Sequence, residues 1–361
     1  MSREVTEVTE GGEVTEVGEV GAPPRRRLPD VNPVLRRELL ERWRGRRAVL
    51  VLTLYVAAIG ALLLLLRWIG TQLLIDQQRW NPSAAMAAGP LLGRFLFENL
   101  LTLVLGLVLL VAPGYAAAQL SGERERRTLG LLRITLVRPR SIVLGKLGAS
   151  TAWIVLLVVV TAPLAASAIV LGGVTFGDLV RGITVVLVVA VGVAAIALAV
   201  SSRARRTTGA VVTTYAIVLA LVGGTVAAGF AQYAFNDFRR IDLPAPLYLN
   251  PVVALADATN ARPVMGSQLP SILEPVASLL SPEEFDAVAL GGVAMDGFDG
   301  VFAEERVVGQ MTTDADGFPL ARAEGTPNVW LITLALYALL TVGSVVIASR
   351  SLGPRDGVRE T

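Results

Sequence analysis

Six apolar segments, each long enough to cross the hydrocarbon core of a lipid bilayer, constrain most strongly what this chain can fold into. They lie at Ala48–Leu66, Phe95–Ala118, Leu147–Gly172, Gly182–Ser202, Thr207–Ala234 and Asn328–Ser349. Segments of about 20 apolar residues are typical of transmembrane helices, because the core that they cross is about 30 Å thick. We therefore expect an all-α polytopic membrane protein with six transmembrane helices.

Basic residues are concentrated on one side of these predicted spans. Residues 25–47, 119–146, 203–206 and 350–361 hold 22 arginines and lysines, whereas the short loops of the other side hold four. Basic loops beside transmembrane spans stay in the cytoplasm. Lys146 is the only lysine in the chain, a bias that fits a GC-rich bacterial genome. We expect a multi-pass protein of a bacterial cytoplasmic membrane, with both termini in the cytoplasm.

The composition excludes most catalytic chemistry. The chain has no cysteine and no histidine, so disulfides, thiolate metal sites and the commonest general base are excluded. Gly145-Lys146 lacks the upstream glycine and the following Ser or Thr of a phosphate-binding loop. The predicted spans contain no aspartate pair, and Glu98 is interpreted as interfacial. We expect a non-catalytic chain that binds no metal, cofactor or nucleic acid.

The regions outside the spans differ in composition and suggest an order along the chain. The predicted organisation is a disordered acidic tail at 1–24, a basic interfacial helix at 25–47, spans one to five with the segment 119–146 at 48–236, an external loop at 237–325, span six at 326–349 and a cytoplasmic tail at 350–361. Within the acidic loop, Asn250 followed by Pro251 predicts a short helix. Asp178 and Arg181 are expected to form a local ion pair at i,i+3.

Residues 25–47 predict an amphipathic helix that lies on the membrane surface. Asn32 followed by Pro33 is a typical helix start. Apolar residues then recur at i, i+4 and i+8 among arginines, a pattern that favours contact with anionic lipid headgroups. The residues assigned to this helix are Leu35, Arg36, Arg37, Glu38, Leu39 and Trp43.

The segment Gln119–Lys146 joins the second and third spans and is strongly basic. Ser121, Gly122 and Glu123 can start a short helix, on which Leu129 and Leu132 share one face. A basic helix with an apolar stripe is suited to docking in a groove of another protein. The residues assigned to this contact are Glu123, Arg124, Glu125, Arg126, Arg127, Thr128, Leu129, Leu131 and Leu132.

The same residues carry a family resemblance. The sequence ERERRTLGLL followed by IVLGK resembles the cytoplasmic segment of ABC-2 type permeases, and NPVLRREL resembles their N-terminal surface helix. In that family, glycine usually stands where this chain has Arg127. The resemblance implies that Ser121–Arg133 holds a coupling helix that contacts a separate ATPase subunit.

The resemblance also implies the rest of the assembly. ATP and Mg²⁺ would bind the partner ATPase, and a second permease copy would complete the pathway, with export as the expected direction. One alternative is a membrane subunit that passes the energy of ATP hydrolysis to an external signalling or assembly step. A secondary transporter is a further alternative, although it predicts charged or broken helices at the midplane of the membrane.

Overall fold

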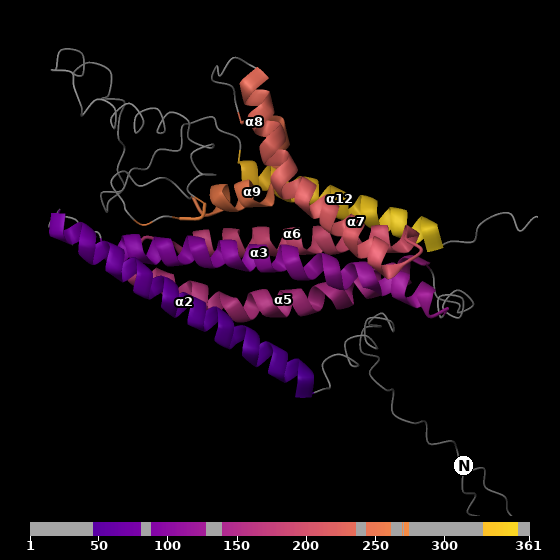
Figure 1. Cartoon of the computed structure of the whole chain (residues 1–361), viewed down its shortest axis with the longest axis horizontal. Helices are drawn as coiled ribbons and strands as arrows, with labels where there is room; N and C mark the ends of the chain where they lie inside the picture. Colours follow the sequence, from indigo (N-terminus) through magenta and orange to yellow (C-terminus); the bar gives the residue numbers. More distant parts are fainter. Residues whose placement is uncertain are drawn as a thin grey trace, which may run out of the picture. The chain divides into compact units, whose positions relative to one another are not determined.

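The computed structural model describes residues 46–80, 88–127, 139–235, 243–260, 269, 271–273 and 328–352, and within them the regular secondary structure is entirely helical (Figure 1). The helices are α2 (Arg46–Trp80), α3 (Ala88–Glu125), α5 (Pro139–Leu171), α6 (Phe176–Arg203), α7 (Thr207–Leu219), η2 (Ala220–Gly224), α8 (Thr225–Phe235), η3 (Ala245–Leu249), α9 (Pro251–Ala258) and α12 (Val329–Leu352). The expected all-α fold is confirmed for this part of the chain.

The prediction of six spans is also confirmed. Six helical stretches in the described ranges are long and apolar enough to cross a membrane. They are α2, α3, α5, α6, the continuous stretch α7–η2–α8 and α12. The expected acidic tail and N-terminal surface helix lie outside the described residues, as does most of the loop 237–325.

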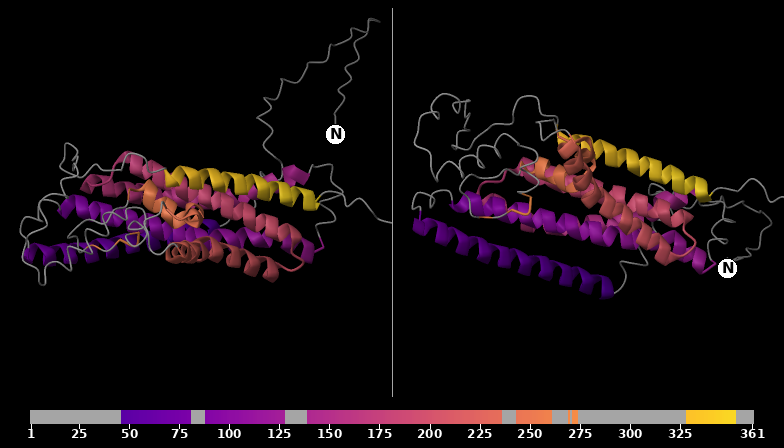
Figure 2. Two further views of the ribbon diagram at one scale, coloured as in Figure 1. Left: turned by 90° about the horizontal axis from the view of Figure 1, so that it is seen from above. Right: turned by 45° about the horizontal axis from the view of Figure 1, so that its top comes forward.

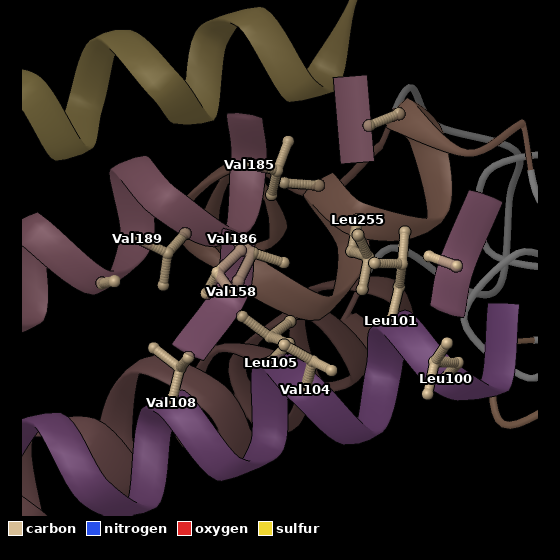
Figure 3. Close-up of a cluster of buried hydrophobic side chains, with 14 of the residues drawn as sticks. Leu100, Leu101, Val104, Leu105, Val108, Val158, Val185, Val186, Val189 and Leu255 are labelled. Carbon is tan, nitrogen blue, oxygen red and sulfur yellow. The ribbon is translucent and has the colours of Figure 1, made fainter. Parts of the chain in front are cut away.

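α6 is the central helix of the bundle and packs against α3, α5 and α12. Valines of α6 pack against leucines of α3 in the buried cluster shown in Figure 3. Glycines on α6 permit the close approach of α6 to both α12 and α3. A Cβ atom added to Gly192 would lie 2.6 Å from the ring of Tyr337 on α12, and one added to Gly182 would lie 2.5 Å from Leu101. Packing of small residues is the usual basis of helix association in membranes, where burial from lipid adds little.

α2 lies at the edge of the bundle and contributes little to its core (Figure 2). Large apolar side chains on it, including Val49, Leu54 and Leu64, are about two-thirds exposed. In a membrane such a surface contacts lipid tails or another transmembrane helix at little cost. One polar contact fixes α2 against its neighbour: the Tyr55 hydroxyl lies 2.8 Å from the Thr161 hydroxyl of α5.

The fifth span contains a π-helical turn, η2, between α7 and α8. Asn250 stabilises this irregular turn, because its side-chain amide donates to the carbonyl of Val222 and to the hydroxyl of Thr225, both at 2.8 Å. The side-chain oxygen of Asn250 accepts from the backbone N–H of Val252 and so caps α9. The helix predicted from Asn250 and Pro251 is thus confirmed. α9 is buried against α3, α6 and α12.

Candidate functional site: the basic end of the bundle

One end of the bundle, named here the basic end, is formed by the last turns of α3, α6 and α12 and the first turns of α5 and α7. In Figure 1 it lies on the right, and the opposite end lies on the left. Exposed arginines surround the basic end: Arg126, Arg127, Arg140, Arg203, Arg205, Arg206 and Arg350. The ends of α3, α6 and α12, the start of α5 and the α6–α7 turn therefore contribute positive charge to one surface.

The last turns of α3 differ from the sequence-based expectation. α3 continues without a break past Ala118 to Glu125, so the prediction of a separate helix starting at Ser121 is wrong. The Ser121 side chain is fully buried, and its hydroxyl bonds to the carbonyl of Ala117 within α3. No proline interrupts the backbone here. The helix therefore persists beyond the apolar stretch, because its polar side chains find partners on neighbouring helices.

Glu123 on α3 pairs with Lys146 on α5. The Lys146 ammonium lies 2.7 Å from a carboxylate oxygen of Glu123, and the side chains are 4% and 23% exposed, respectively. The two residues flank the segment between α3 and α5. Their ion pair joins the helix that enters this segment to the helix that leaves it.

Arg124 and Glu125 hold the tight turn between α6 and α7. The Arg124 guanidinium donates to the carbonyl of Ser202 at 2.7 Å and to that of Ala204. The Glu125 carboxylate accepts from the backbone N–H and the hydroxyl of Thr207, each at 2.8 Å. These bonds satisfy polar groups at the end of α6 and the start of α7, which a helix cannot satisfy internally.

Ser201 provides a further contact between α3 and α6. Its hydroxyl oxygen accepts from the backbone N–H groups of Leu120 and Ser121, at 3.1 and 2.9 Å. It also lies 3.3 Å from the hydroxyl of Ser121. Around these polar groups, Leu120, Val143 and Leu198 belong to a separate buried apolar cluster at this end of the bundle. The basic end is thus a packed junction of α3, α5 and the α6–α7 turn.

The backbone of α3 ends in a left-handed residue. Arg127 has φ of +59° and donates its N–H to the carbonyl of Arg124 at 3.1 Å. A left-handed residue just past a helix is usually glycine, because a side chain is strained there. Arg127 is also the position where the resembling family usually has glycine. The chain keeps the helix-ending conformation that this glycine would provide.

The predicted contact residues are only partly placed by the structure. Glu123, Arg124 and Glu125 lie at the basic end and bond within the bundle, whereas Arg126 and Arg127 are exposed there. The remaining ones, namely Thr128, Leu129, Leu131 and Leu132, lie outside the described residues, as do the surface-helix residues Leu35, Arg36, Arg37, Glu38, Leu39 and Trp43.

Sequence reasoning missed the partners of these residues. Lys146, Ser201 and Thr207 were not assigned to the site, although Lys146 is conspicuous as the single lysine. Ser201 and Thr207 lie about 80 residues from their partners on α3. No local pattern marks such a pairing.

The opposite end contains a second polar network. The Arg94 guanidinium donates to Glu98 at 2.8 Å and to the carbonyl of Asn260, which follows α9. The Asn260 amide donates to Asp178 at 3.1 Å, and Asp178 accepts from Arg181 at 2.5 Å. The expected pair of Asp178 and Arg181 is confirmed. Glu98 is 3% exposed and forms part of this network between α3, α6 and the end of α9.

Neither network resembles a metal site. Within the described ranges, the structure contains no group of three or more carboxylate, histidine or cysteine side chains that could hold a metal ion. The contacts at both ends hold helices together.

Sequence comparison connects this arrangement to a known family. A family model described as ABC-2 family transporter protein matches residues 32–280, which include α2 to α9 and the segment between α3 and α5. No curated protein matches the chain. Membership of this family implies association with an ABC ATPase partner. The chain therefore belongs to the ABC-2 family of transporter proteins and is a multi-pass membrane permease of the ABC transporter class.

Proposed function

We propose that this permease is the membrane subunit of an ATP-driven exporter, and that its ATPase subunit docks at the basic end. The observation that carries the proposal is the position of the segment 126–138 between α3 and α5, at the junction where α3 also holds the α6–α7 turn. A partner that moves this segment acts directly on α3 and α5 and, through the α6–α7 turn, on two further spans. Because the sequence lacks a phosphate-binding loop, ATP and Mg²⁺ are expected on the partner.

The charge distribution supports a cytoplasmic location for the basic end. Arginines at the ends of spans stay on the cytoplasmic side, where they also meet anionic headgroups. The same orientation places both termini in the cytoplasm of a bacterium and the loop 237–325 outside. The predicted surface helix around Leu35 and Trp43 would then lie on the inner face of the membrane.

The distribution of charges along the spans favours ATP over an ion gradient as the energy source. α5 has no charged residue after Lys146, and α6 has none between Arg181 and Arg203. The stretch α7–η2–α8 has none at all, and α12 has none before Arg350. Transporters driven by ions usually have ionisable residues at the midplane of the membrane. The π-helical turn η2 in the fifth span contains no such residue and leaves that span continuous. Movement of these spans is therefore expected to come from a partner at their ends.

A test of orientation uses the absence of native cysteine. We expect Ser281→Cys to react with a membrane-impermeant maleimide in intact cells, and Arg205→Cys to react only after the membrane is opened. The reverse labelling pattern would contradict the proposed orientation. A second permease copy is also part of the proposal, and an active detergent-solubilised particle with a single permease would contradict it.

The test of docking targets the two predicted contact leucines. Replacing Leu129 and Leu132 together with Asp should abolish recovery of the ATPase with the permease, because leucines that fill a pocket contribute most to such interfaces. Thr208→Asp, an exposed position on α7 at the same end, is the control and should keep the ATPase. The measurement is co-purification of the ATPase with tagged permease from membranes. Normal recovery and ATP hydrolysis in the leucine variant would place the contact elsewhere.

A further inference from the structure

We propose that Glu123 and Lys146 are positioning residues for energy coupling, because their ion pair makes the end of α3 and the start of α5 move together. The inference rests on the proposed function, in which an ATPase moves the segment between these helices. It gives Lys146 a role that neither the family match nor the sequence patterns assign.

The geometry of α3 separates two contacts that are adjacent in the sequence. Consecutive residues on an α-helix point roughly 100° apart. Accordingly, Glu123 reaches Lys146 on α5, whereas Arg124 reaches the carbonyls of Ser202 and Ala204 at the α6–α7 turn. The last turn of α3 therefore makes two separate sets of contacts, one with α5 and one with the α6–α7 turn. Substitution of Glu123 removes the first set, and substitution of Arg124 removes the second.

The burial of the pair argues for positioning rather than for stability alone. Lys146 is 3% exposed, and apolar residues such as Leu120 and Val143 form the buried cluster at this end. An apolar pair of similar volume would usually stabilise such a site as well as an ion pair does. An ion pair adds a requirement for one relative position of the two helices, because its attraction depends on charge separation and direction. That requirement is what a rigid link between moving helices needs.

The experiment measures distances between spin labels at the basic end. Arg140→Cys with Arg350→Cys reports the position of α5 against α12, and Arg205→Cys with Arg350→Cys reports the α6–α7 turn against α12. All three positions are exposed, and none belongs to the ion pair or to the segment 126–138. Because they lie on the basic end, recovery of the ATPase with each labelled permease is checked before the distances are measured. The permease is measured in lipid nanodiscs, alone and in complex with its ATPase, without nucleotide and with ATP plus vanadate.

In the complex with the unmodified pair, ATP plus vanadate should shift both distances. Glu123→Leu combined with Lys146→Met removes both charges, so that neither is left buried alone. This double variant should lose the shift at α5 and keep the shift at the α6–α7 turn, with the ATPase still recovered. Arg124→Gln should keep the shift at α5 and lose the shift at the α6–α7 turn. The exchange Glu123→Lys with Lys146→Glu should restore the shift at α5, which a purely steric role of these side chains would not do.

Two outcomes in the complex overturn the inference. One is a normal shift at α5 in the double variant, and the other is a wild-type complex that hydrolyses ATP without moving either distance. The isolated permease provides an arm that does not depend on the ATPase. There, the double variant should broaden the distribution of α5–α12 distances and leave the turn–α12 distribution unchanged; equal widths overturn the link between α3 and α5. If no ATPase is recovered with wild-type permease, that result counts against the proposed function instead. The widths of the distance distributions in the isolated permease still test whether the ion pair links α3 to α5.

Discussion

Each end of the bundle contains an ion pair that involves a glutamate of α3, but the more buried member is the cation at one end and the acid at the other. At the basic end the cation is the more buried partner, since the Lys146 side chain is 4% exposed and that of Glu123 is 23% exposed. At the opposite end the acid is the more buried partner, since the side chain of Glu98 is 4% exposed and that of Arg94 is 27% exposed. One charged side chain of each pair is therefore almost fully buried.

The ends differ more strongly in their remaining charge. Among the described residues of the opposite end, Arg94, Glu98, Asp178 and Arg181 bond to one another or to Asn260, so that two positive and two negative charges balance. At the basic end, a similar internal network is surrounded by exposed arginines. The comparison teaches that internal pairing holds the helices at both ends, whereas the excess positive charge at one end is available for orientation in the membrane and for a partner.

The largest effect should come from the carboxylates on α3. Glu123→Gln removes the carboxylate that lies 2.7 Å from the buried Lys146 ammonium, which should lower the free energy of unfolding by about 3–5 kcal/mol. Glu98→Gln leaves Arg94, which is exposed enough to reach water, and should cost about 1–2 kcal/mol. Denaturant unfolding in mixed micelles measures both. If both variants lose the same free energy of unfolding, the difference in which partner is buried has no energetic consequence.

The tight turn between α5 and α6 should be the next most sensitive feature. Gly173 has φ of +76°, and an added Cβ would lie 2.3 Å from the carbonyl oxygen of Pro90. Gly173→Ala should therefore lower the free energy of unfolding by about 2 kcal/mol or more. The matched control is Gly209→Ala at the basic end, where an added Cβ meets nothing within 4 Å. A control that loses as much as Gly173→Ala would contradict the steric explanation.

A smaller effect of opposite sign is expected at Arg127, the left-handed residue of the basic end. Arg127→Gly removes the strain of a side chain at positive φ and should raise the free energy of unfolding by about 1 kcal/mol. The thermal unfolding midpoint of the detergent-solubilised permease measures it. Arg126→Gly, one residue earlier, relieves no such strain and should not stabilise the protein. Stabilisation by both changes would indicate relief of charge repulsion instead.

The smallest effect on folding is expected from the exposed arginines. Arg205→Ala with Arg206→Ala should leave the free energy of unfolding within about 0.5 kcal/mol of wild type. It should slow association with the ATPase and reduce the dependence of that association on salt. Stopped-flow or surface-binding kinetics at two ionic strengths measures the change. An unchanged association rate and salt dependence would remove these arginines from the docking surface.

The sequence by itself determined the number of spans and several local features. Segment length and hydropathy predicted all six spans, because a transmembrane helix satisfies its own backbone hydrogen bonds and depends little on its neighbours for its existence. Short-range rules also predicted the helix after Asn250 and the pair of Asp178 and Arg181, since both depend on residues within one turn.

Only the tertiary structure decided where α3 ends and what its last turns do. The apolar pattern stops at Ala118, so the polar residues that follow were interpreted as the start of a new helix. They continue α3 because Ser201, Ser202 and Lys146, brought close by packing, satisfy their polar groups. The π-helical turn in the fifth span was likewise not predicted, since Asn250, which bonds to it, lies 28 residues from Val222. Pairings of this kind depend on how helices pack, and no property of a single segment encodes them.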